Sequence, residues 1–142
     1  MIIAVDFDGT CVTHEFPKVG RDIGAVPVLK ELVEKGHKII LYTMRSHPNK
    51  NNQGKTLSGG IISNDTLQDA IDWFKKNEIP LWGINENPKQ KEWTSSSKIY
   101  ANIYIDDAAL GIPLKYDKNS ALSRSYVDWE QIRILLKIKG VL

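Results

Sequence analysis

Apolar residues along the chain fall into two kinds of pattern, and these patterns alternate. Short continuous apolar runs predict buried parallel strands, whereas apolar residues three or four positions apart predict amphipathic helices. The predicted strands are 2–6, 37–43, 81–84, 103–105 and a short fifth strand at 112–115. The predicted helices are 26–35, 66–77 and 129–139, with Asn64 or Asp65 and Asp128 as caps. This alternation predicts an α/β fold with a mainly parallel central sheet of about five strands.

Polar side chains stand near the ends of these strands. Asp6 and Asp8 follow the first strand, Thr43 follows the second, Lys98 precedes the fourth, and Asp106–Asp107 end it. The carboxyl ends of parallel strands share one edge of a sheet, where ligands bind. A single aspartate in such a place is commonly a helix cap or a turn residue. Four such features in this order favour one functional site instead.

The residue types suggest the chemistry of that site. Carboxylates gathered at one edge repel each other unless a cation compensates their charge. Mg²⁺ prefers oxygen ligands, uses few carboxylates and leaves positions for water and phosphate oxygens. With a lysine and a hydroxyl added, the set suits phosphoryl transfer. Asp6 and Asp8 suit a covalent nucleophile and a general acid/base in one cleft, and Gly9 lets the backbone turn away.

The motifs resemble those of the haloacid dehalogenase superfamily. Residues 6–10, Asp-Phe-Asp-Gly-Thr, match the DxDGT signature after an apolar strand. Residues 40–43 resemble the second motif, Lys98 resembles the lysine of the third, and residues 103–107 resemble the acidic fourth motif. The resemblance covers roughly the first hundred and ten residues in the family's motif order. It implies a three-layer, Rossmann-like, HAD-like domain.

The resemblance also implies roles for the aspartates, with Mg²⁺ as the cofactor. Asp6 would form an aspartyl-phosphate, and Asp8 would be the general acid/base. The metal residues would be Asp6, Asp8 through its main-chain carbonyl, and Asp106. Asp107 would support the metal shell or orient Lys98. The presence of Asp8 points to phosphatase or phosphotransferase action.

A second group of residues is expected to hold the phosphorylated substrate. Thr43 and Lys98 would bind phosphoryl oxygens, and Thr10 belongs to the same motif as the aspartate pair. Lys89 and Lys91 remain alternatives to Lys98 as the motif lysine. Arg45 could meet substrate charge, or could equally be an exposed arginine in a polar loop. His14 and His47 lie in loops that could border the cleft, and Cys11 is expected to be a buried thiol.

The spacing of the motifs leaves no room for a full cap domain. Only 32 residues separate Thr10 from Thr43, and a predicted helix occupies many of them. We therefore expect an open site, with 45–63 as the candidate for a small lid loop. Such a site suits a large or extended phosphorylated substrate, or closure by a neighbouring subunit in a homo-oligomer.

Composition narrows the class of protein rather than its chemistry. The 142 residues suit a single domain, 1–142, and 42% apolar with 25% charged residues is typical of a globular chain. The net charge of +2 neither requires nor excludes nucleic acid. One cysteine allows no disulfide within the chain, and no run approaches the ~18 apolar residues of a membrane span. We expect a cytoplasmic protein with no membrane partner.

Three functions are compatible with these features. The first is a Mg²⁺-dependent phosphomonoester hydrolase, whose substrate could be a sugar phosphate, a nucleotide or a phosphate on nucleic acid. The second is a receiver-like signalling module, which would carry its phosphorylated aspartate at the end of the third strand. That strand ends Ile84-Asn85-Glu86, without an aspartate. The third is a protein of the same fold that binds phosphate without turnover. The residue types present favour the enzyme.

Overall fold

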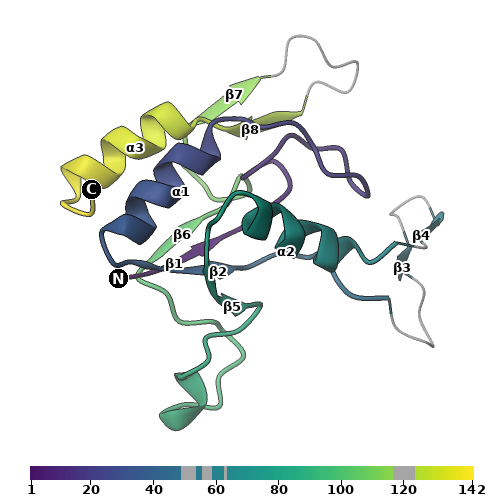
Figure 1. Ribbon diagram of the computed structural model, residues 1–142, viewed down its shortest axis with the longest axis horizontal. Coiled ribbons are helices and arrows are strands. Elements are labelled where there is room, and N and C mark those ends of the chain that lie inside the picture. The colour runs from purple at the N-terminus through teal and green to yellow at the C-terminus, as the bar shows by residue number, and fades with distance from the viewer. Residues whose placement is uncertain (49–53, 56–58, 63, 117–123) are drawn as a thin grey trace.

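The core of the protein is a parallel sheet of four strands. The computed structural model describes residues 1–48, 54–55, 59–62, 64–116 and 124–142. The strands are β1 (Ile2–Val5), β2 (Lys38–Leu41), β5 (Leu81–Ile84) and β6 (Ile103–Ile105), in the order β5-β2-β1-β6. Their positions confirm four of the five predicted strands and the α/β class. All three strand pairs are parallel, so the carboxyl ends lie along one edge (Figure 1).

Three helices pack against one face of this sheet. They are α1 (Ala25–Glu34), α2 (Thr66–Lys76) and α3 (Trp129–Ile138), within one residue of the predicted bounds at most ends. Apolar residues of all three helices form one buried cluster with Ile3 and Val5 of β1 and Ile39 and Leu41 of β2. The predicted caps are confirmed, because Asp65 accepts a hydrogen bond from the amide of Gln68 and Asp128 caps α3 in the same way.

The opposite face of the sheet is covered by irregular chain. Ala4 and Ile40 alternate with the residues of the main cluster, so they face the other side, and both are buried. The segment 85–102 lies there, with only a short 3-10 turn, η1 (Gln90–Glu92), as regular structure (Figure 1). The hydroxyl of Tyr104 donates to the carbonyl of Ile99 and ties the segment to β6. This segment therefore runs from the carboxyl end of β5 back to the amino end of β6.

The fifth predicted strand does not join the parallel sheet. Residues 112–115 were expected to form it, but β7 (Leu114–Tyr116) pairs antiparallel with β8 (Ser125–Val127) in a separate two-stranded sheet. Pro113 explains the difference, because proline lacks the N–H that a strand inside a sheet must donate. Its carbonyl instead accepts from the amide of Asp128, at the start of α3. The prediction of a mainly parallel sheet of about five strands is corrected to a parallel sheet of four strands.

The predicted lid loop, 45–63, is only partly described. Residues 49–53, 56–58 and 63 lie outside the described part of the chain. Within it, β3 (Gly54–Lys55) and β4 (Ile61–Ile62) form an antiparallel pair that projects beyond α2 (Figure 1). In the part of the chain that the structure describes, no helix combines the length and the apolar character needed to cross a bilayer.

Candidate active site

The strand order brings the predicted site residues to one edge of the sheet. Strand β1 lies between β2 and β6, with Val5 opposite both Leu41 and Ile105. The amide of Asp6 donates to the carbonyl of Ile105 at 3.0 Å, so Asp6 starts beside the point where Asp106 leaves β6. The convergence predicted for the aspartates is therefore present, although about a hundred residues separate their motifs.

Three carboxylates form an acidic cluster at this edge. One oxygen from each of Asp6, Asp106 and Asp107 lies within 4.8 Å of the other two. The pKa of Asp6 is raised to about 7, mainly by burial and also by the charges of Asp106, Asp107 and Asp8, against the opposing hydrogen bond from the backbone of Phe7. A set of partly buried carboxylate oxygens fits the preference of Mg²⁺ for hard ligands. The cluster therefore suits a divalent cation, which would also favour the ionised form of Asp6.

The turn after β1 holds the first of these carboxylates in place. The carbonyl of Phe7 accepts hydrogen bonds from the amides of residues 10, 11 and 12, at 2.8–3.2 Å. Gly9 has φ of 79°, in the left-handed region, and a Cβ there would come within 2.0 Å of the His14 ring. The carbonyl of Gly9 also accepts from the amide of Val127 in β8. The chain can therefore fold back beneath the cluster only with glycine at this position.

Thr10 connects parts of the site through hydrogen bonds in this turn. Its side chain is fully buried, which is incompatible with the predicted contact to substrate. The hydroxyl donates to Asp6 Oδ2 at 3.3 Å and accepts from the amide of Asp107 at 3.0 Å. Its carbonyl accepts from Nε1 of Trp129, at 2.6 Å. Thr10 therefore links two members of the acidic cluster to each other and to α3, and its assignment to substrate binding is corrected.

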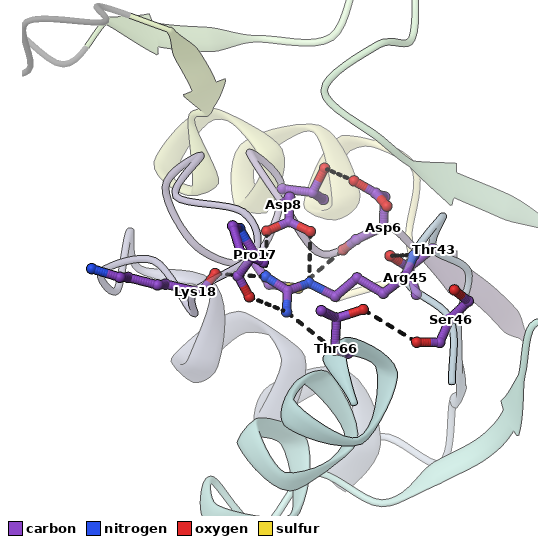
Figure 2. Close-up of polar contacts among 10 residues, drawn as sticks. Asp6, Asp8, Pro17, Lys18, Thr43, Arg45, Ser46 and Thr66 are labelled. Atoms are coloured by element: carbon purple, nitrogen blue, oxygen red, sulfur yellow. Dashed lines mark hydrogen bonds and ion pairs between the residues drawn. The ribbon is translucent and has the colours of Figure 1, made fainter. Parts of the chain in front are cut away.

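Asp8 lies apart from the acidic cluster and pairs with Arg45. Nε and Nη2 of Arg45 donate to the two carboxylate oxygens of Asp8, both at 2.7 Å (Figure 2). Arg45 is only 2% exposed. The expectation that Arg45 is an exposed arginine is wrong, because the side chain is buried against Asp8. Its contact with substrate charge stays a prediction, which the burial does not favour. The carboxylate of Asp8 is not among the three that gather for a metal, which leaves only its main-chain carbonyl for that role.

Asp107 has a partner that the sequence did not indicate. Nε2 of His14 lies 2.9 Å from Asp107 Oδ2, and both side chains are largely buried. Asp107 was expected to support the metal shell or to orient Lys98; it lies in the acidic cluster and contacts His14, and no contact with Lys98 is present among the described residues. The sequence placed His14 in a loop that could border the cleft, as it does, but no spacing or motif indicated its contact with Asp107.

Thr43 occupies the place that the second motif predicts. It follows β2, is 9% exposed, and its amide donates to Asn85 Oδ1 at 2.8 Å. Its hydroxyl oxygen accepts from the amide of Arg45 at 3.2 Å, which leaves the hydroxyl proton to donate elsewhere. Asn85 directly follows β5, so this strand contributes to the site by holding the loop after β2 in place.

The lysine of the third motif is not brought to the cluster. Lys98 is exposed and lies in the segment that leads to the amino end of β6, the edge opposite to Asp106. Lys89 and Lys91 are also exposed, nearer to the carboxyl end of β5. In the ranges that the structure describes, no ion pair or hydrogen bond joins any of these lysines to the aspartates of the site. A residue that precedes a strand lies at the wrong edge, so the preference for Lys98 rested on the wrong geometry.

The surroundings of two further side chains, Cys11 and His47, indicate their roles. Burial raises the pKa of the Cys11 thiol well above its ordinary value of 9.0, and the charges of Asp6 and Asp8 add to this. Cys11 is therefore a buried thiol, as predicted, with no nucleophilic character. Nδ1 of His47 lies 2.7 Å from Asp65, the cap of α2, so this histidine supports the helix start rather than the acidic cluster.

Comparison with known proteins gives one relative by structure. No family model matches the chain, and no curated protein matches it significantly. The chain is similar to the solved structure of a conserved protein coded by a locus from Bacteroides thetaiotaomicron, with 28% identity and a TM-score of 0.69. The match covers 98% of this chain and 91% of that one. This likeness bears on the fold and not on the chemistry of the site.

Proposed function

We propose that this protein is a Mg²⁺-dependent phosphomonoester hydrolase with a Rossmann-like, HAD-like core. The observation that carries the proposal is the close approach of the Asp6, Asp106 and Asp107 carboxylates, within 4.8 Å of one another, with Asp8 two residues along the chain from Asp6. The DxDGT sequence of residues 6–10 gives the same assignment independently of the geometry. The three carboxylates come from the ends of two strands, and a turn contact, from the amide of Ala108 to Asp106 Oδ1, accounts for one oxygen of one of them.

The reaction would take place in two steps on Asp6. In the first, an oxygen of Asp6 attacks phosphorus, the bond from phosphorus to the leaving oxygen breaks, and Asp8 gives that oxygen a proton. In the second, water attacks the aspartyl-phosphate, Asp8 takes a proton from the water, and the bond to Asp6 breaks. Inorganic phosphate leaves, and both aspartates return to their starting states.

The remaining residues have supporting roles in this scheme. Asp6, Asp106 and Asp107 would hold the cation, which supplies positive charge for the phosphoryl oxygens and lowers repulsion within the cluster. Thr43 would donate its hydroxyl proton to a phosphoryl oxygen. Lys89 and Lys91, rather than Lys98, are the better candidates for a lysine that approaches the phosphoryl group, because they follow the carboxyl end of β5.

The open edge bears on the class of substrate. No helical cap covers the cluster in the part of the chain that the structure describes. We propose that the site takes either an extended phosphorylated molecule or a small phosphate ester enclosed by a neighbouring subunit. The net charge of +2 leaves nucleic acid among the candidates.

An activity screen tests the proposal directly. Purified protein is incubated with Mg²⁺ and a panel of sugar phosphates, nucleotides and end-phosphorylated oligonucleotides, and released phosphate is measured. Asp6→Asn and Asp8→Asn should lose turnover, whereas Asp72→Asn, an exposed aspartate on α2 that contacts Gln68, should not. Trapping with beryllium fluoride, read by fluorine NMR, should occupy Asp6 and not the Asp6→Asn variant.

The outcomes separate the three functions considered for this chain. Turnover that is lost with Asp6 supports the hydrolase. Phosphorylation by a donor without further turnover would support a signalling module. Binding of phosphate without either reaction would support a non-catalytic protein, and equal turnover in wild type and both variants would exclude Asp6 and Asp8 as the reacting groups.

A further inference from the structure

The guanidinium of Arg45 has no hydrogen-bond donor left for a ligand. A guanidinium carries five N–H groups. Two are used on Asp8, and the other three donate to the carbonyls of Lys18 at 2.7 Å, Thr66 at 3.1 Å and Pro17 at 3.4 Å (Figure 2). The side chain is 1% exposed. A phosphate group could bind Arg45 only by breaking one of these contacts in the interior.

The surroundings of Arg45 fix its orientation as well as its position. Its guanidinium carbon lies 4.9 Å from the ring centre of Phe7 and 5.3 Å from that of Phe16. Thr66 begins α2 and its carbonyl is part of that helix, whereas Pro17 and Lys18 belong to the loop before α1. Arg45 is therefore held by two separate elements and two aromatic rings, and Asp8 is its one charged partner among the described residues.

The contacts with Arg45 fix the plane of the Asp8 carboxylate. Two parallel hydrogen bonds of 2.7 Å constrain both the position and the rotation of the carboxylate, which one contact could not do. The Asp8 side chain is still 18% exposed, so solvent reaches part of it. A group that transfers protons must lie within about 2.6–3.2 Å of the atom it serves, and a displacement of about 1 Å can cost 100-fold in rate.

We infer that Arg45 is the positioning residue that holds Asp8 for proton transfer in the proposed hydrolysis, and that it does not bind substrate. The inference rests on the proposed function of Asp8. Arg45 neither gives nor takes a proton. It keeps Asp8 where one oxygen can protonate the leaving oxygen in the first step and deprotonate water in the second.

The two steps respond differently to a misplaced Asp8 when the substrate is p-nitrophenyl phosphate. The p-nitrophenolate ion leaves without needing a proton, so formation of the aspartyl-phosphate depends little on Asp8. Hydrolysis of that intermediate still needs Asp8 to accept a proton from water. A variant with misplaced Asp8 should therefore accumulate the aspartyl-phosphate, a signature that general destabilisation of the fold does not produce.

The experiment compares wild type with Arg45→Lys and Arg45→Gln. The matched control is Arg133→Lys, because Arg133 also holds a carboxylate with two nitrogens, that of Glu31, on the exposed surface. Each protein is checked by circular dichroism, then assayed with p-nitrophenyl phosphate and Mg²⁺ for kcat, KM and the acid-stable phosphoenzyme fraction. Two Arg45 variants are made so that the test can still be carried out if one of them does not fold.

For the Arg45 variants we expect kcat to fall about 100-fold, KM to fall with it so that kcat/KM changes little, and the phosphoenzyme fraction to rise. Arg133→Lys should match wild type. In the Asp8→Asn background, Arg45→Lys should cost little more, because the two residues act as one unit.

Three results would overturn the inference. A higher KM with unchanged kcat would make Arg45 a substrate-binding residue. A lower kcat with an unchanged phosphoenzyme fraction would leave it a purely structural role. Wild type that forms no phosphoenzyme and releases no phosphate from any substrate would refute the proposed function itself, and the inference with it.

Discussion

The raised pKa of Asp6 predicts that the metal-free protein loses stability as the pH rises. The pKa of Asp6 is about 7 in the folded protein, against an ordinary value of 3.8. Between these values the folded state keeps a proton that the unfolded chain has released, so stability falls by ~1.4 kcal/mol per pH unit. Below pH 4 the group has no effect, and above pH 7 the full cost of about 4 kcal/mol remains.

The variant Asp6→Asn isolates this contribution because it removes the charge and nearly keeps the size. At pH 8 and with EDTA, it should melt higher than wild type by on the order of 10 °C, and the difference should vanish near pH 4. Other groups that titrate in this range affect both proteins alike, so the difference between the two curves is the quantity to measure. Asp72→Asn serves as the control, since that side chain is exposed.

Mg²⁺ should change the comparison in a defined direction. Binding of a cation beside Asp6 favours the ionised carboxylate, so Mg²⁺ should raise the melting temperature of wild type more at pH 8 than at pH 5. For Asp6→Asn, Mg²⁺ should raise the melting temperature less than for wild type at both pH values. Thermal melts followed by circular dichroism, in steps of one pH unit from 4 to 8, provide the measurement. Parallel curves for wild type and Asp6→Asn in EDTA would refute the argument that burial and neighbouring charges raise this pKa.

Further predictions concern the residues around the cluster. His14→Gln, which loses the 2.9 Å contact of the imidazole with Asp107, should weaken Mg²⁺ binding about 10-fold by calorimetry. Gly9→Ala should abolish activity and lower the melting temperature by several degrees, because the added Cβ would meet the His14 ring at 2.0 Å. Asp128→Ala should cost about 1 kcal/mol of stability, or roughly 3 °C, through loss of the α3 cap. A normal melt for Gly9→Ala, or unchanged Mg²⁺ affinity for His14→Gln, would contradict the respective contact.

The fold was predictable where apolar patterns are strong. The four sheet strands and three helices each bury a continuous run or a helical stripe, and these patterns depend only on local sequence. A strand was predicted at 112–115, close to β7, but its pairing with β8 was missed because both strands have only three residues and β7 is exposed. The crossover after β5 was expected to be irregular, but nothing in its sequence indicated that it would cover the second face of the sheet.

The sequence predicted those parts of the candidate site whose positions follow from the ends of the strands. Asp6, Thr43 and Asp106 converge because parallel strands end at one edge, a rule that needs no knowledge of side-chain contacts. Arg45 was noticed, yet its partner could not be read from the sequence. Its burial depends on carbonyls from 17–18 and on the start of α2, and only the folded chain brings these together.

The charge at this edge also indicates when a cation would be needed. The site contains four aspartates. The guanidinium of Arg45 is hydrogen-bonded to one of them, Asp8, and so cannot neutralise the other three. Among the described residues no lysine is paired with these carboxylates. A phosphate monoester brings about two more negative charges near neutral pH, so it would be repelled from the metal-free edge. If the proposed function holds, removing Mg²⁺ should therefore raise the dissociation constant for inorganic phosphate, measured by calorimetry, as well as stop turnover. A site with its own free lysine or arginine would bind phosphate without the metal, so equal affinity with Mg²⁺ and with EDTA would show that a cationic side chain outside the contacts described above reaches the cluster.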